Sequence, residues 1–383
     1  MKIKDNNQQL DICNESIPKY VRYKIANELN YQDLMSLCNV NKTCSEMCND
    51  DRYWMNRIYD KIGVIPKNVK NGEYRDWYIK NVNNLYYIDD KMNTDSQAVK
   101  LLANVSNVAP YNNFSDSEQF IVYFVDALHN LKYINGTKDN FKENFLFGGV
   151  KKIVWEHKES FDHGPYIIYL DDSDTLIVHD LEIDLKLEIS KNVKMVKCYE
   201  ITTSNSIVIR LYYTKNDKLY IVGNVTGFLH GGETPYETDL YVSDVAYIGD
   251  AQNEDVEEEE LLEFLVYVDL KGNVIYKDKI LAKNSKKIFE YMFRRNLNIY
   301  SIDKYDILFI LSQTDDNVKR PRFIDYDVKC NIWQFYNGNE YRLYKNGNLY
   351  LKNLTFHNDF KLIMTNVIDI YVGINGVIIS KTI

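Results

Sequence analysis

The spacing of apolar residues divides the chain into two parts near residue 90. Up to about Lys80 these residues recur at helical spacing, as Val21, Ile25 and Leu29 do in steps of four. Ser16 and Pro18 suit the start of a helix, because Ser can cap it and Pro fits its first turn. We predict further short helices after Asn30, through Val40–Cys48, from Asp51 to Ile58, and over Glu73–Tyr78.

Beyond Leu101 the pattern changes to short runs with period-two alternation, separated by turn residues, which predicts β-hairpins. The paired strands are Phe120–Val125 with Leu131–Ile134, Tyr166–Leu170 with Leu176–Val178, Ile207–Leu211 with Leu219–Ile221, Leu265–Val268 with Val274–Tyr276, Tyr341–Tyr344 with Leu349–Leu351, and Ile368–Tyr371 with Val377–Ile379. A less regular copy centres on Ile307–Leu311. The returning strands recur about every 45–55 residues, in the range of one propeller blade.

These patterns predict a mostly β protein with an α-helical N-terminus. We expect residues 1–80 to form a helical domain, 81–100 a linker, and 101–383 a β-propeller of six or seven blades. Within the repeats, Asn284–Phe293 is the one segment that we expect could be helical. Val122, Ile168, Ile209, Val266 and Leu343 should be buried between blades. A β-sandwich or two small β-domains are the alternatives.

Composition narrows the classes of function. A net charge of -9 and an isoelectric point near 5.3 argue against a protein whose main partner is nucleic acid. The longest apolar runs, such as Phe264–Val268, have the length of a strand, well short of the ~20 residues of a membrane-spanning helix. The N-terminus has no apolar core of a signal peptide. We therefore expect no membrane partner and a cytoplasmic protein, with the nucleus as an alternative.

The cysteines and histidines do not predict a metal or catalytic site. Six cysteines are too few for a disulfide-stapled secreted scaffold, so a reducing compartment is expected. Cys38, Cys44 and Cys48 have the spacing C-x5-C-x3-C, which lacks the close pairs of zinc sites, and burial as small apolar residues is the preferred interpretation. The six histidines are scattered over different repeats, without a His-x-x-x-His pair.

Three further motifs contain residue types that can bind ions or partners. Glu254–Glu260 is a strongly acidic run, read as a solvated loop or as a patch for a basic partner. Asp171–Asp174 could suggest Ca²⁺, but it lacks the remaining ligands of a Ca²⁺ loop, so a β-turn is predicted. Gly148-Gly149 precedes a strand rather than a helix, which excludes a phosphate loop. We expect no cofactor and no metal.

The N-terminal part resembles an F-box from roughly Ile17 to Trp54, with a weaker extension to Tyr78. The likeness rests on Ile17-Pro18 at the first helix, Asp33-Leu34 in the second, Val40 after it, and Asp51 and Trp54 at the end. Cys44 stands where the family usually has a Trp. The resemblance implies docking on the Skp-type adaptor of an SCF ubiquitin ligase, through the following residues: Ile17, Pro18, Ile25, Leu34, Leu37 and Val40. An ordinary helical cap on the β-domain is the alternative.

The β-repeats resemble those of the regulator of chromosome condensation family, through Lys271–Tyr276 and Asn346–Tyr350. Most of that family's paired glycines and its mid-blade His are missing, so the likeness concerns shape alone. An F-box with such repeats, in a chain rich in Asn, Ile, Lys and Tyr, is similar to proteins of giant DNA viruses. For a viral chain the expected location is the host cytoplasm.

We therefore predict a substrate-recognition adaptor rather than an enzyme, with a target protein that the sequence does not name. A propeller hydrolase and a structural or virion protein without a ligase role are the alternatives. Carboxylates gathered at the propeller axis would favour a hydrolase. A rim of Tyr and Phe would favour protein binding.

Overall fold

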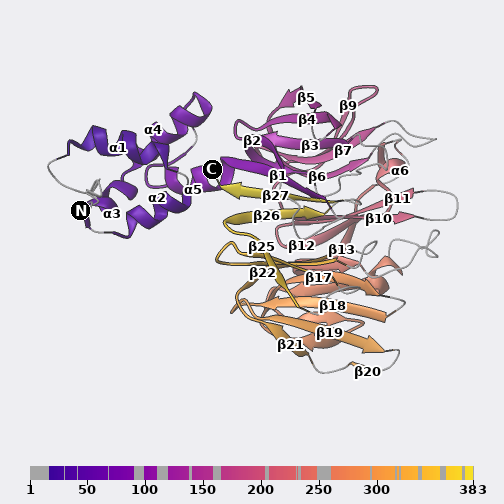
Figure 1. Cartoon of the computed structure of the whole chain (residues 1–383). Helices are drawn as coiled ribbons and strands as arrows, with labels where there is room; N and C mark the ends of the chain where they lie inside the picture. Colours follow the sequence, from indigo (N-terminus) through magenta and orange to yellow (C-terminus); the bar gives the residue numbers. More distant parts are fainter. Residues whose placement is uncertain are drawn as a thin grey trace.

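The computed structural model describes residues 17–29, 31–40, 42–67, 69–89, 99–109, 120–137, 140–157, 165–202, 207–229, 231, 234–247, 260–293, 296–314, 317–318, 321–334, 339–353, 359–372 and 376–382. A helical block precedes a series of antiparallel sheets (Figure 1). The helices of this block are α1 (Lys19–Glu28), α2 (Tyr31–Cys38), α3 (Lys42–Cys48), α4 (Asp51–Ile62) and α5 (Tyr74–Asn81).

Local sequence explains where α4 begins and ends. The Asp50 side chain caps its first turn by accepting a hydrogen bond from the backbone N–H of Arg52. Gly63 closes its last turn with a φ of 78°, a left-handed conformation that glycine adopts without steric cost. The inner face of α4 carries Tyr53, Trp54 and Ile58, all fully buried in the core of the helical block.

The strands of the first half of the sheet region fall into sets of four. The first set is β2 (Val99–Val108), β3 (Phe120–Asp126), β4 (Asn130–Thr137) and β5 (Asn140–Gly148). The second is β6 (Val150–His157), β7 (Tyr166–Asp171), β8 (Leu176–Asp180) and β9 (Leu185–Ser190). The third is β10 (Val193–Thr202), β11 (Ile207–Lys215), β12 (Lys218–Val222) and the first half of β13 (Tyr236–Tyr247), with α6 (Val225–Leu229) before β13.

The remaining strands continue this order. The second half of β13 pairs with β14 (Leu265–Asp269), followed by β15 (Val274–Tyr276) and β16 (Lys279–Ala282), and η1 (Glu260–Phe264) precedes β14. The next set is β17 (Ser285–Phe293), β18 (Asn296–Asp303), β19 (Leu308–Thr314) and β21 (Arg322–Asp325), with β20 (Asn317–Val318) also on β19. Then come β22 (Val328–Gln334), β23 (Asn339–Tyr344), β24 (Leu349–Asn353) and β25 (Lys361–Met364).

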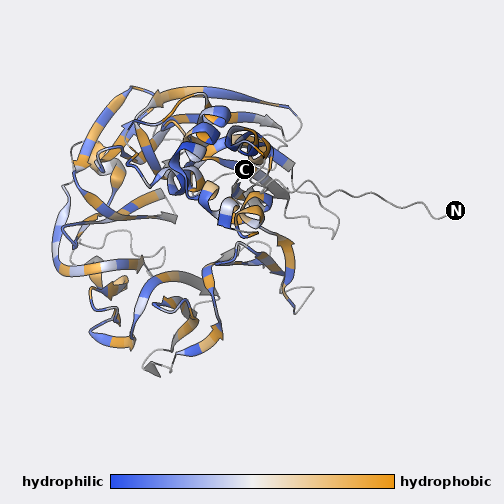
Figure 2. Ribbon diagram, turned by 90° about the vertical axis from the view of Figure 1, so that its left-hand side faces the viewer, coloured by the Kyte–Doolittle hydropathy of each residue, from blue (hydrophilic) through white to orange (hydrophobic). Residues whose placement is uncertain are grey.

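The two ends of the sheet region share the last set. Here β26 (Val367–Val372) pairs with β27 (Gly376–Thr382), and β27 pairs with β1 (Asn83–Asp89) in an unbroken register from Asn83↔Thr382 to Asp89↔Gly376. The first half of β2 completes this set by pairing with β1. Strands from opposite ends of the chain thus form one sheet. In Figure 2 the sheets follow one another around the molecule, a propeller-like arrangement.

The same irregularity marks the first strand of every set. Among the described strands, each pairing of a first with a second strand has a β-bulge immediately after its opening residue. These opening residues are Val105, Val150, Val193, Val242, Ser285, Val328 and Val367. A bulge that recurs at one structural position in every set indicates a true structural repeat, which we call the unit.

A shared turn joins the second and third strands of four units. In each, an Asp carboxylate accepts hydrogen bonds from the backbone N–H groups two and four residues later. These aspartates are Asp126, Asp171, Asp269 and Asp303. The predicted β-turn at Asp171–Asp174 is therefore confirmed, and its carboxylate serves the backbone.

Neighbouring units are joined by backbone bonds and apolar cores. The N–H of Val193 donates to the carbonyl of Asp174 in the preceding unit at 3.0 Å, and Val150, Val242, Ser285, Val328 and Val367 do the same with their preceding turns. Ile168 and Ile209, from adjacent units, share one core cluster. All five residues predicted to be buried between blades are fully buried.

Two predictions about elements were wrong. The segment 81–100, predicted to be a linker, contains β1 and begins β2, which pair with each other, and β1 also pairs with β27, almost 300 residues further along the chain. The segment Asn284–Phe293, considered as a helix, forms β17 from Ser285 onward, paired with β18. In both cases long-range or cross-strand pairing decides the structure.

Candidate functional site

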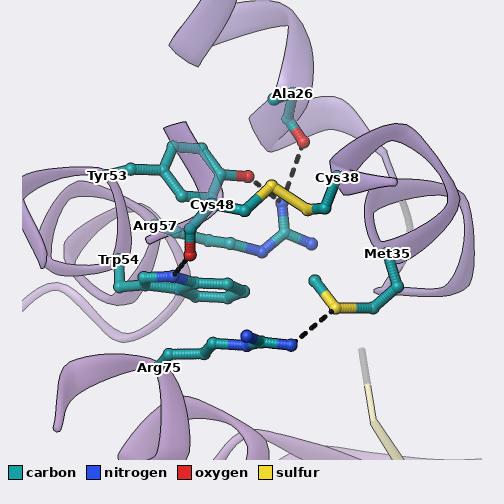
Figure 3. The surroundings of a disulfide bond; sticks show 8 residues. All are labelled: Ala26, Met35, Cys38, Cys48, Tyr53, Trp54, Arg57 and Arg75. Atoms are coloured by element: carbon teal, nitrogen blue, oxygen red, sulfur yellow. Dashed lines mark hydrogen bonds between the residues drawn. A yellow bond between two sulfur atoms is a disulfide. The ribbon is translucent and has the colours of Figure 1, made fainter. Parts of the chain in front are cut away.

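The helical block has a core of its own, centred on Trp54. The indole Nε1 of Trp54 donates to the carbonyl of Cys48 at 2.7 Å, which ties α4 to the end of α3 (Figure 3). Arg57 lies fully buried beside it and donates to the carbonyls of Ala26 at 3.1 Å and Leu29 at 2.7 Å. Arg57 therefore satisfies carbonyl groups at the C-terminal end of α1, where the helix leaves them without partners.

A disulfide joins Cys38 at the end of α2 to Cys48 at the end of α3 (Figure 3). Cys44 is disulfide-bonded as well. Burial of all three cysteines is confirmed. The expectation of reduced thiols in this block is wrong for this structure, because the fold brings the ends of two helices together at a spacing that no sequence motif marks.

The six predicted docking residues separate into two groups. Leu34 is fully buried in the core of the helical block, so it stabilises the block and is not available to a partner. Pro18 is exposed, and Val40 is 63% exposed. The remaining three, Ile17, Ile25 and Leu37, are half-buried. We call the five accessible residues Ile17, Pro18, Ile25, Leu37 and Val40 the docking residues.

Asp50 connects the first helix to the fourth. Its carboxylate accepts from Lys19 at 2.6 Å and from the Tyr23 hydroxyl at 2.5 Å, besides capping α4. Burial alone would raise the pKa of Asp50, but hydrogen bonds from Lys19, Tyr23 and the Arg52 N–H outweigh it and hold the pKa at about 2. Asp50 was not predicted from the sequence to connect two helices.

The helical block packs on the end of the sheet region where the shared turns lie. Ala127, in the first of these turns, belongs to the core cluster of the helical block. Asn104, directly before the first bulged strand segment, donates to the carbonyl of Lys61 at 3.2 Å. We call this end of the sheet region the turn face, because the shared turns and the opening residues of the units are hydrogen-bonded to each other there.

Large apolar side chains stay exposed on the turn face. Leu270 lies one residue after Asp269 in one shared turn and Tyr305 lies two residues after Asp303 in another, with 55% and 66% of their surface exposed. Tyr241 and Tyr326, which lie one and two residues before opening residues, are 55% and 61% exposed. We call these four residues the turn-face rim. Exposed aromatic residues in such a set are typical of protein-binding surfaces.

The first strands of the units lie together in the middle of the sheet region. Contacts join β2 to β6, β6 to β10, β10 to β13, β13 to β17 and β17 to β22. The residues two positions after the opening residues are Asn107, Lys152, Met195, Asp244, Lys287, Cys330 and Asp369. Lysines therefore accompany the two carboxylates here, so the arrangement differs from the carboxylate pair that would favour a hydrolase.

The two carboxylates of this set have different surroundings. Asp244 pairs with Lys197 at 2.8 Å and accepts from the Ile288 N–H at 2.9 Å. Burial raises the pKa of Asp369, although the charges of Lys329 and Lys287 oppose it. Burial also raises the pKa of Cys330 to about 12, which makes its thiol a poor nucleophile.

Several sequence motifs add nothing to a site. Glu254–Glu259, His163, His230 and His357 lie outside the described residues, as do the side chains of His157 and Glu260. His179 bonds the exposed Asp184 at 2.8 Å, within one unit. Within the described residues no group of three His, Cys, Asp or Glu side chains is placed to hold a metal ion. No helix in the described part of the chain is long and apolar enough to span a membrane.

Comparisons with known proteins give shape similarities only. No family model matches the chain, and no curated protein matches it significantly. Among solved structures, a mutant of AofleA from Arthrobotrys oligospora matches 72% of this chain and 89% of its own, with 12% identity and a TM-score of 0.38. BBS1N in complex with ARL6DN matches 78% of this chain and 97% of its own, with 10% identity and a TM-score of 0.47.

Proposed function

We propose that this chain is a non-enzymatic adaptor in which the helical block docks on a Skp-type protein of an SCF ubiquitin ligase and the sheet region holds a target protein. One observation carries the proposal: Pro18 and Val40 remain accessible, although the core around Trp54 and Ile58 is complete without them. Apolar side chains that a domain does not need for its own core are available as anchors for a partner.

For the sheet region we propose a β-propeller of seven blades, each blade being one unit. Support comes from the repeated bulge, from the hydrogen bond that links each opening residue after the first to the turn before it, and from the β27–β1 pairing. A ring of blades buries both faces of every sheet and leaves only short edges. On this interpretation the last blade takes two strands from each end of the region.

The turn-face rim is the part of the propeller that we propose for the target protein. It lies on the same end of the sheet region as the helical block, since Ala127 and Asn104 of that end contact the block. A target bound to Tyr305 and Leu270 would therefore lie on the same end of the molecule as the ligase recruited by the helical block. Short loops on a rigid scaffold commonly carry binding residues.

A structural or virion protein is the second candidate. The Cys38–Cys48 disulfide favours it, because disulfides persist in oxidising surroundings, which include virion surfaces, and are rare in the cytosol. In that case the docking residues would contact another structural protein, and the chain would have no ligase role.

The adaptor proposal is tested by binding of the full chain to a purified Skp-type adaptor, with and without reductant. Val40→Asp should weaken binding by about thirtyfold or more, because a buried apolar anchor is worth about 2 kcal/mol or more. Val64→Asp is the matched control: Val64 is 41% exposed and follows the cap residue of α4, outside the predicted docking residues, so this variant should bind like the unchanged chain. Leu34 is unsuitable as a test, since its burial makes any loss a folding effect.

Absence of binding in both redox conditions would reject the ligase role and leave the structural candidate. Equal losses for Val40→Asp and Val64→Asp would show that the contact lies elsewhere on the block. Binding only in the presence of reductant would indicate that the cysteines in α2 and α3 must be reduced before the block can dock.

A further inference from the structure

Three exposed lysines accompany the turn-face rim. Lys271 follows Leu270 in the shared turn before β15, and Lys304 precedes Tyr305 in the shared turn before β19. Lys283 lies in the connection between β16 and β17. All three residues are exposed. We call Lys271, Lys283 and Lys304 the rim lysines.

Backbone hydrogen bonds hold the three segments of the rim lysines side by side. The N–H of Ser285 donates to the carbonyl of Gly272 at 2.8 Å, which joins the segment before β17 to the shared turn before β15. The N–H of Lys304 donates to the carbonyl of Asn284 at 2.7 Å, which joins the next shared turn to the same segment. Each rim lysine either belongs to one of these bonded pairs or directly precedes a member of one. The rim lysines therefore form one basic strip across two neighbouring units.

The positive charge of this strip is not neutralised within the described part of the chain. None of the rim lysines has an ion-pair partner among the described residues. The ammonium group of Lys304 instead lies over the ring of Tyr305, 5.0 Å from its centroid. This concentration of unpaired positive charge contrasts with the net charge of -9 of the whole chain.

The carboxylates of the same three segments have other partners. Asp269 and Asp303 accept hydrogen bonds from the backbone of their own turns. Asp306 is buried and pairs with two lysines outside the strip. Asp327, in the next connection, is exposed and adds one carboxylate at the end of the strip. Three unpaired lysines therefore exceed the carboxylates that are free to face a partner.

We propose that the target protein binds this strip through an acidic segment that also carries an apolar or aromatic side chain. Carboxylates of such a segment would neutralise the rim lysines, and its apolar side chain would pack on Leu270 and Tyr305. Nucleic acid fits less well, because a chain of net charge -9 repels a phosphate backbone. This inference rests on the proposed role of the turn-face rim and specifies the chemistry of the target.

The test is fluorescence anisotropy with the full chain and a labelled synthetic peptide, in the absence of any ligase adaptor. The peptide consists of Glu and Asp residues with one central Phe. We expect saturable binding that weakens as salt is added, because exposed charges are screened. The triple variant Lys271→Gln, Lys283→Gln and Lys304→Gln should weaken binding by about tenfold, the size expected for the loss of three exposed ion pairs.

A second triple variant removes the same charge elsewhere. Lys277→Gln, Lys279→Gln and Lys361→Gln change exposed residues at the ends of β15, β16 and β25 that lie away from the turn face, and this variant should bind like the unchanged chain. The apolar contact has its own measurement. The double variant Leu270→Ser with Tyr305→Ser should lose the preference for the Phe peptide over a peptide with Ala in its place.

Circular dichroism and thermal unfolding establish that each variant is folded before affinities are compared. Absence of saturable peptide binding would overturn the inference, as would equal losses in the two triple variants. Tighter binding of a single-stranded oligonucleotide or of anionic vesicles would also overturn it, in favour of another class of partner. The assay contains no adaptor, so its failure does not affect the result for Val40→Asp, and loss of the ligase role does not affect the peptide result.

Discussion

At the scale of single residues, buried and half-buried charges determine how the helical block is assembled. Arg57 donates to carbonyls at the end of α1 and lies over the ring of Tyr78 at 5.3 Å, so it connects three helices. Removing its side chain would leave those carbonyls buried and unpaired, the costly form of a lost hydrogen bond. The sequence of α4 did not predict the burial of Arg57, because Arg is normally an exposed residue.

Asp50 makes stability of the helical block depend on pH. Its folded pKa of about 2 lies below the ordinary value of 3.8. A group whose folded pKa is depressed stabilises the fold above its unfolded pKa, and this contribution disappears as pH falls through the folded value. We expect Asp50→Asn to lower the free energy of unfolding by about 1–2 kcal/mol at pH 7, a figure reduced by the exposure of Lys19.

Urea unfolding of the two proteins at pH 7, 4 and 2.5 measures this difference. It should shrink steadily below pH 4, because the unfolded chain then binds a proton at Asp50 while the folded chain binds it only near pH 2. Asn is itself a good helix cap, so the comparison isolates the charge. Asp239→Asn, at a fully exposed position, is the control and should show no pH-dependent difference. A difference that stays constant down to pH 2.5 would contradict the assignment.

At the scale of elements, the cores between units depend on single apolar side chains. Ile168 of β7 is fully buried against the next unit, whereas Ile183, in the turn after β8, is 65% exposed. Ile168→Asp should cost several kcal/mol of unfolding free energy, because it buries an unpaired charge. Ile183→Asp should change it by less than about 0.5 kcal/mol. Denaturant titrations of both variants check this, and similar values would show that the core assignment is wrong.

Hairpins were predictable from the sequence because their signal is local. The predicted return strands near residues 131, 176, 219 and 274 correspond to β4, β8, β12 and β15. Alternation fixes which side chains face a core, and the Asp-containing turns mark where strands reverse. The hairpin β26–β27 was found in the same way, although it joins the first and second strands of its unit rather than the second and third.

Features that depend on distant pairing were not predictable in this way. The strand β1 takes one of its two partners, β27, from the other end of the chain, which no local pattern in the sequence shows. The charged residues two positions after the opening residues, such as Lys152 and Asp244, were not predicted to come together, because the bulge that sets their position has no local sequence signal. The F-box resemblance implied adaptor contacts for Leu34 and Val40 alike, and only the packed structure separates the buried Leu34 from the exposed Val40.

At the scale of the whole molecule, the β27–β1 pairing joins the ends of the sheet region. Ile379 of β27 lies at the centre of this sheet, fully buried, opposite Tyr86 on one side and Ile370 on the other. Its core cluster also contains Leu343 from the preceding unit. One side chain therefore helps to hold strands from both ends of the region and a neighbouring unit together.

Ile379→Asp should for this reason open the closure between the two ends. We expect a loss of several kcal/mol of unfolding free energy and faster amide exchange in β1 and the first half of β2, which lie almost 300 residues away in sequence. Ile280→Asp is the matched control, since Ile280 lies in the outermost strand of its sheet and is 53% exposed. It should leave exchange in β1 unchanged. If the amides of β1 exchange as slowly in Ile379→Asp as in the unchanged chain, this sheet does not hold the two ends together. The proposed closed propeller would then need another contact between its ends.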